Sequence, residues 1–202
     1  MARRKKVAAA VLMMVLLLNT VGARNLFDTG LKVVSLYDAD QGIADSSFFE
    51  GMGDGYNWDV GVGIETRFSF LHLSGMITNH EDGGNDNGMN FYASALFDIP
   101  VINDFLYLKA GGGISNTIYL PESEDESFMY GKDEVREFDS FGQMVSESPI
   151  HLKAGVDIII GPTVVSLFYL RETSGTFGES IETILSSSGT NKAGAGLTLS
   201  LF

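Results

Sequence analysis

Apolar and polar residues alternate strictly along residues 56–70. One set of alternate positions is apolar or aromatic apart from a single threonine, and the interleaved set is polar, charged or glycine. The first set comprises Tyr56, Trp58, Val60, Val62, Ile64, Thr66, Phe68 and Phe70, and the second comprises Asn57, Asp59, Gly61, Gly63, Glu65, Arg67 and Ser69. Because successive side chains of a strand point to opposite faces, this period of two predicts a β-strand between an apolar and a polar environment.

Seven further segments follow the same rule. The alternation is clear in residues 89–99, 150–160 and 191–201. It is weaker, with apolar residues on both faces for part of the length, in residues 31–38, 71–78, 105–119 and 163–171. We therefore predict an all-β fold of eight strands.

The connections between these strands alternate between long and short. The long ones are polar and mostly acidic, and they span residues 38–55, 80–88, 120–149 and 172–189. The short ones lie near residues 69–71, 100–104 and 161–162. Long loops at one end and tight turns at the other are typical of antiparallel up-and-down transmembrane β-barrels, in which the long loops are extracellular.

The N-terminus has the pattern of a cleaved secretory signal peptide over residues 1–23. Four basic residues precede an unbroken apolar run from Val7 to Leu18, and Val21, Gly22 and Ala23 provide a small-residue cleavage site. A run of twelve residues is too short for a membrane helix, which takes about 20. The predicted barrel domain therefore covers residues 24–202.

Charge and cysteine content narrow the classes of protein. Without the signal peptide, nine basic residues face twenty-six acidic ones, a formal net charge of −17. This balance argues against a nucleic-acid partner, because phosphates require lysine and arginine. The chain has no cysteine, which excludes disulfides and a lipid-modified N-terminal cysteine. No apolar run beyond residue 23 approaches the length of a membrane helix, so an integral protein must be a barrel.

A soluble barrel with an apolar interior would show the same alternation, but three features favour the membrane. The polar face is rich in glycine rather than in the lysine and glutamate of a solvated exterior. The apolar faces lack charge for the 9–11 residues or so that a tilted strand needs to cross a bilayer. Aromatic residues lie toward the strand ends, as in interfacial girdles: Tyr37, Tyr56, Trp58, Phe68, Phe70, Phe97, Phe105 and Phe202.

On this layout the chain resembles the small eight-stranded outer-membrane proteins of the OmpA, OmpX and OmpW type. The terminal aromatic residue Phe202 matches part of the assembly signal of that group, although Leu197, Leu199 and Leu201 are one position out of phase with it. The resemblance implies a monomer in the cell outer membrane, in contact with its lipid and with the barrel assembly machinery. The OmpW type further implies a small hydrophobic ligand.

The polar faces bring several charged residues into the predicted lumen. We expect the lumen to be lined by Lys32, Asp59, Glu65, Arg67, His72, Lys109, Lys153, Asp157 and Lys192. One interpretation is a network of ion pairs that plugs a narrow barrel, since eight strands enclose little more than their own side chains. The other is a polar conduit. Val34 and Leu36 share a face with Lys32, so part of the lumen is expected to be apolar.

The sequence contains little evidence for a catalytic site. His72 and Ser74 lie two apart on one face, as in the His-x-Ser pair of lipid A deacylase barrels, which makes a lipid A-modifying hydrolase the third hypothesis. The more apolar face of this strand is the opposite one, so His72 is expected to face the lumen. Acidic clusters in the loops lack the spacing of an EF-hand, and we expect no cofactor and no metal site.

The longest loop, residues 120–149, combines acidic residues with aromatic ones. Exposed aromatic side chains can anchor a binding partner. We therefore take Phe128, Tyr130, Phe138 and Phe141 as loop-interaction candidates. The first functional hypothesis is a non-enzymatic barrel that is structural or forms a narrow passage for small molecules, hydrophobic ones among them. The second is a surface adhesin that recognises a host-surface partner through its loops.

Overall fold

The computed structural model describes residues 27–39, 52, 57–79, 88–102, 105–121, 128–131, 135–177, 179, 181–186 and 188–201. The predicted signal peptide, residues 1–23, lies outside these residues. So do Tyr56, Phe202 and parts of all four predicted long loops.

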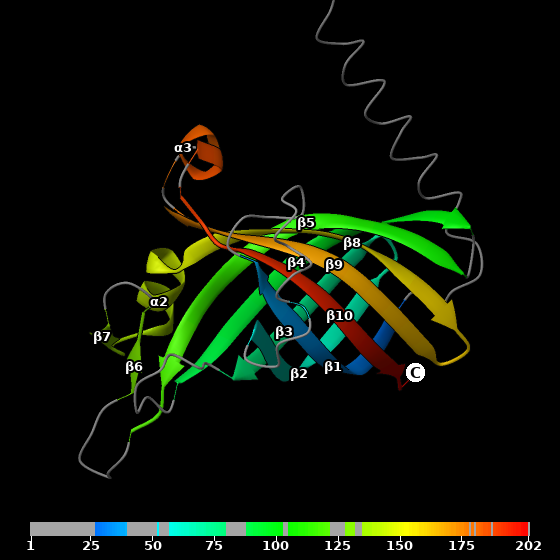
Figure 1. Cartoon of the computed structure of the whole chain (residues 1–202), viewed down its shortest axis with the longest axis horizontal. Coiled ribbons are helices and arrows are strands. Elements are labelled where there is room, and N and C mark those ends of the chain that lie inside the picture. Colours follow the sequence, from blue (N-terminus) through cyan, green and yellow to red (C-terminus); the bar gives the residue numbers. More distant parts are fainter. Residues whose placement is uncertain are drawn as a thin grey trace, which may run out of the picture.

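Eight antiparallel strands close into a ring, as predicted (Figure 1). They are β1 (Phe27–Ala39), β2 (Trp58–Phe68), β3 (Leu71–Asn79), β4 (Gly88–Ile102), β5 (Leu106–Tyr119), β8 (Pro149–Ile160), β9 (Thr163–Thr176) and β10 (Asn191–Ser200). Each strand pairs with the next along the chain, and β1 pairs with β10 to close the ring. Closure matters because it leaves no unpaired edge that lipid would have to solvate.

Three strands run further than the sequence pattern predicts, and one of them, β1, begins at Phe27 instead of residue 31. β9 continues through residues 172–176, which we expected to be loop, because the segment after α3 supplies hydrogen-bond partners: Glu172 N–H donates to Thr190 O and Ser174 N–H to Ser188 O. β4 continues past Pro100 to Ile102, with an irregularity in its pairing at the proline. Proline lacks the N–H that a regular ladder needs, and a bulge accommodates that loss.

The predicted assignment of the two faces is correct. On β2, the outward residues Val60, Val62 and Ile64 are more than half exposed, whereas Glu65 and Arg67 are buried inside the ring. This distribution is the reverse of that in a water-soluble barrel, and it leaves an apolar belt around the exterior. No helix among the described residues is long and apolar enough to span a bilayer.

Aromatic pairs lie at both ends of the exterior belt. Near the long loops, the Tyr37 and Trp58 rings have centroids 5.3 Å apart. Near the short turns, Phe27 meets Phe68 at 5.1 Å, and Phe70 stacks on Phe97. Amphipathic and aromatic rings at these levels are typical of the membrane interfaces.

The long loops carry folded elements of their own. Residues 120–149 contain the short strands β6 (Met129–Tyr130) and β7 (Arg136–Glu137) and the helix α2 (Phe141–Glu147). The last long loop contains α3 (Ile181–Ser186). In Figure 1 these elements gather at one end of the barrel, away from the C-terminus.

Candidate functional site

A buried ion-pair network fills the half of the barrel interior nearest the short turns. Asp157 Oδ2 of β8 accepts a hydrogen bond from Arg67 Nη2 of β2, and the other carboxylate oxygen of Asp157 lies 2.5 Å from Lys109 Nζ. Arg67 Nε also lies 3.5 Å from Asp98 of β4. Buried charges of this kind require partners because transfer from water is costly. One carboxylate thus joins strands on opposite sides of the ring.

A second group of charges lies beside the first. Lys32 Nζ lies 2.5 Å from Glu65 Oε1, and the Thr198 hydroxyl donates to Glu65 Oε2 at 2.9 Å. The His72 ring bridges the two groups, with Nε2 3.5 Å from Glu65 and Nδ1 3.3 Å from Asp98. All of these side chains are buried, so the interior is a connected polar network rather than a set of isolated pairs.

Three lysines surround a single aromatic ring. The Nζ atoms of Lys153, Lys32 and Lys109 lie 4.2, 5.1 and 6.0 Å from the centroid of Phe168. Within the part of the chain that the structure describes, Lys153 Nζ has no hydrogen-bond partner. The ring face of Phe168 is therefore the nearest electrostatic partner of Lys153, through a cation–π contact.

An apolar layer separates this network from the extracellular mouth. Val34, Leu36 and Leu170 pack with Met76, Tyr92 and Phe168 in the middle of the ring. Along β1 these inward positions follow Lys32 and precede Asp38, so the layer lies across the lumen. The lumen is therefore partly apolar, as the alternation predicted.

A smaller ion-pair group lies at the mouth. Lys192 Nζ lies 3.0 Å from both Asp38 and Asp59. The Asp38 side chain is half exposed, whereas Lys192 is buried. Solvent therefore reaches the outer rim of this group only.

The structure places all nine predicted lumen residues inside the ring and joins eight of them in the ion-pair groups above; Lys153 stands over Phe168 instead. Sequence reasoning missed Asp98 and Asp38 as members. Their signal was present, since Asp98 alternates with the outward residues Phe97 and Ile99. No group of His, Asp and Glu side chains among the described residues is arranged to hold a metal ion.

The predicted His72 and Ser74 pair faces the lumen. Both side chains are buried, and His72 contacts Glu65 and Asp98. The Ser74 hydroxyl has no hydrogen-bond partner among the described residues. No described histidine therefore accepts its proton to activate it as a nucleophile.

A small folded unit, which we name the platform, projects from the extracellular end of β5. It comprises β6, β7 and α2; β6 extends the sheet by pairing with β5, and Ser140 caps α2 through Gln143 N–H. Asn116 on the outer side of β5 donates to Ser148 Oγ at 2.9 Å, which ties the end of α2 to the wall. The platform is therefore held by the barrel rather than suspended from it.

The four aromatic loop candidates divide into one internal and three external residues. Tyr130 is buried, packs edge-on against Phe138 and donates from its hydroxyl to Glu147 at 2.8 Å. Phe128, Phe138 and Phe141 are 52%, 42% and 67% exposed. Tyr130 thus organises the platform, while the three phenylalanines face solvent.

Glu147 anchors the platform electrostatically. Besides the hydrogen bond from Tyr130, it receives Arg136 Nη1 at 3.0 Å. The Tyr130 hydrogen bond is the main reason why the pKa of Glu147 is lowered, and burial followed by the same bond raises the pKa of Tyr130. Both shifts favour the ionised carboxylate and the neutral phenol that this hydrogen bond requires.

The fold is similar to that of known outer-membrane barrels. No family model and no curated protein matches the chain. The N-terminal β-barrel domain of Pseudomonas aeruginosa OprF aligns with a TM-score of 0.50 at 10% identity, covering 86% of this chain and 97% of that one. P. aeruginosa OprH (TM-score 0.46, 16% identity, 85% and 99% covered) and Neisserial surface protein A (0.44, 11%, 87% and 97%) also align.

The likeness to the OprF domain confirms the predicted resemblance at the level of fold. The apolar exterior belt is that of an integral, membrane-spanning β-barrel, in agreement with the predicted location in the cell outer membrane.

Proposed function

We propose that the barrel is a closed, non-enzymatic membrane anchor that displays a protein-binding surface on its platform. The observation that carries the proposal is the exposure of Phe128, Phe138 and Phe141 on a unit that is tied to the barrel wall. Aromatic side chains on a rigid support lose little conformational freedom on binding, and they are frequent among the residues that dominate interface energies.

The charges around these phenylalanines suggest the chemistry of the partner. Glu137 and Asp139 are exposed beside Phe138, while Arg136 is engaged by Glu147. The long loops are acidic throughout, and the predicted mature chain has a net charge of −17. A protein with an apolar patch bordered by basic residues would complement this surface and would be attracted to it over distance.

The packed interior supports an anchor in preference to a passage. Of the nine predicted lumen residues, all except Asp59 are at least nine-tenths buried, which leaves little room for water beside them. The apolar layer adds a barrier, because ions crossing it would lose their hydration.

We expect the reconstituted barrel to conduct no more than a protein-free planar bilayer. A Phe168→Ser/Leu170→Ser variant removes two side chains of the apolar layer and is expected to raise the ion conductance, provided that it still migrates as a compact barrel on an unheated gel. Steady conductance by the wild-type protein would contradict the closed barrel and restore the passage hypothesis.

The binding surface is tested by display of the chain on a non-adherent bacterium. We expect adherence to cultured epithelial cells or to immobilised matrix and serum proteins, and a loss of at least about tenfold in the Phe138→Ser/Phe141→Ser variant, since one interface anchor is worth about 2 kcal/mol. Leu185→Ser, at an exposed apolar position of α3 in another loop, is the matched control. Adherence that is absent from the wild type, or equal in all three proteins, would refute the proposal.

A further inference from the structure

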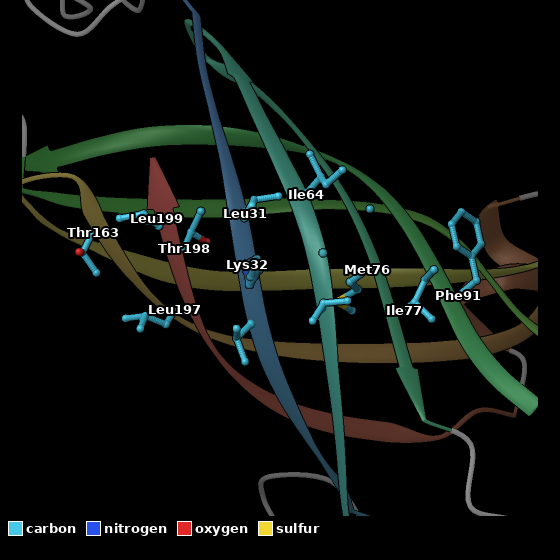
Figure 2. Close-up of a pocket in the computed structure, with 14 residues that line it drawn as sticks. Leu31, Lys32, Ile64, Met76, Ile77, Phe91, Thr163, Leu197, Thr198 and Leu199 are labelled. Atoms are coloured by element: carbon cyan, nitrogen blue, oxygen red, sulfur yellow. The ribbon is translucent and has the colours of Figure 1, made fainter. Parts of the chain in front are cut away.

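An apolar groove runs along the outer wall of the barrel across β10, β1, β2 and β3. It has a volume of about 850 Å³ and is lined on the outside by aliphatic side chains, among them Leu31, Ile64, Ile77 and Leu199. Figure 2 shows these side chains on successive strands of the wall. At Gly75 the floor is open, because a Cβ atom built there would meet nothing within 4 Å.

A second hollow of about 710 Å³ continues this groove around the wall. It shares Ile64 and Gly75 with the first and extends over β4, β5 and β8. Its floor holds the small outward residues Gly75, Ala93, Ala95 and Gly112. Its lining also includes Val145 of α2 and Phe177, which follows β9, so the extracellular loops border it.

The strand register makes the two hollows one track. Successive cross-strand partners form a single row of outward residues: Thr163, Leu199, Leu31, Ile64, Gly75, Ala93, Ile114 and Ile150. The row begins beside the short turn between β8 and β9 and ends beside α2 at the extracellular end. Because the strands of a barrel are tilted, such a row climbs across the membrane rather than circling it at one depth.

The width of the hollow selects its occupant. Outward residues on one strand are two positions apart, about 6.8 Å, so the gap left where Gly75 and Ala93 lie between larger side chains admits an object about one hydrocarbon chain wide. A helix with its side chains is about 10–12 Å across and does not fit. We infer that the track holds a hydrocarbon chain of an outer-leaflet lipid whose headgroup carries a phosphate.

The phosphate follows from the position of one arginine. Among the described residues of the eight barrel strands, Arg171 is the only charged residue at an outward position. It lies toward the extracellular end of β9 and pairs with Leu152, whose other partner is Gly112 of the groove floor. A cation at this level, two strands from Gly112 on the groove floor, suits a lipid phosphate at the membrane surface.

A variant with a filled groove tests the inference. Gly75→Leu/Ala93→Leu places two side chains on the floor, and Gly75 has the space to accept one without a clash. Ala110→Leu/Ala154→Leu is the matched control, because both alanines face outward, are exposed and border neither hollow. Both variants are first checked for the compact form on unheated gels.

The measurement is native mass spectrometry of the delipidated, detergent-solubilised barrel with added phosphatidylglycerol. We expect one tightly retained lipid per barrel, at least tenfold weaker retention in the filled variant, and unchanged retention in the control. Diacylglycerol, which lacks the phosphate, is expected to bind the wild type more weakly, and Arg171→Gln to abolish that difference.

Two results would overturn the inference. Equal retention by the filled variant and the control would show that the track does not select the lipid. A wild-type dimer that becomes a monomer only in the filled variant would show that a second copy of the chain occupies the groove. Neither result changes the adherence expected through the platform. The lipid experiment therefore tests the groove independently of the proposed function.

Discussion

Replacement of Asp157 by asparagine is expected to lower the free energy of unfolding by about 3–5 kcal/mol, the cost of breaking a buried ion pair from one side. Asp157 is fully buried and is shared by Arg67 and Lys109, so the amide would leave two interior cations short of their common partner. Chemical unfolding of the barrel in lipid vesicles, followed through the fluorescence of Trp58, the single tryptophan, provides the measurement.

Asp38→Asn is the control for this prediction. Asp38 also pairs with a lysine, Lys192, but its side chain is half exposed and Lys192 keeps Asp59 as a second partner. We therefore expect a loss below about 1 kcal/mol. Equal losses for the two variants would show that the interior is wet enough to screen its charges, which would weaken the case for a closed barrel.

Replacement of Val62 by arginine is expected to cost about 2–4 kcal/mol, the effect of a basic side chain at the middle of the lipid-facing surface. Val62 is 63% exposed in the central part of β2, and its side chain points away from the interior. In a water-exposed site the same change would be nearly neutral. The same unfolding experiment in vesicles measures the difference.

The depth dependence of this penalty is the control. Ile102 is also aliphatic and exposed, but it ends β4 beside a short turn, at the level of the membrane interface. Ile102→Arg is expected to cost no more than about 1 kcal/mol, because the arginine can reach the headgroups. A Val62→Arg variant as stable as the wild type would contradict the placement of this face in lipid.

The interior, the exterior and the platform are three separate regions of one barrel. The interior contributes stability through ion pairs and the apolar layer. The exterior contributes the membrane contact, and the track on it is proposed to select a lipid. The platform is proposed to bind a protein, and among the described residues it is joined to the barrel through β5 and through the start of β8. Changes in one region should therefore leave the other two measurable.

The sequence by itself determined the strands and the environment of their faces. A period of two specifies both at once, because a side chain at every second position must face the same side. The inward direction of Lys32, Arg67 and His72 followed from their neighbours alone, as did the apolar part of the lumen. Where pairing depended on another segment, as in residues 172–176, the local pattern was insufficient.

Only the tertiary structure decided which residues meet. Arg67 and Asp157 are ninety positions apart, and they pair because the stagger of the closed ring brings β2 and β8 to the same depth. Gly75, Ala93 and Gly112 are unremarkable along the chain and become the floor of a groove through the register of three strands. The sequence marks each face of each strand, but closure and stagger are properties of the whole barrel, and they alone create the network and the groove.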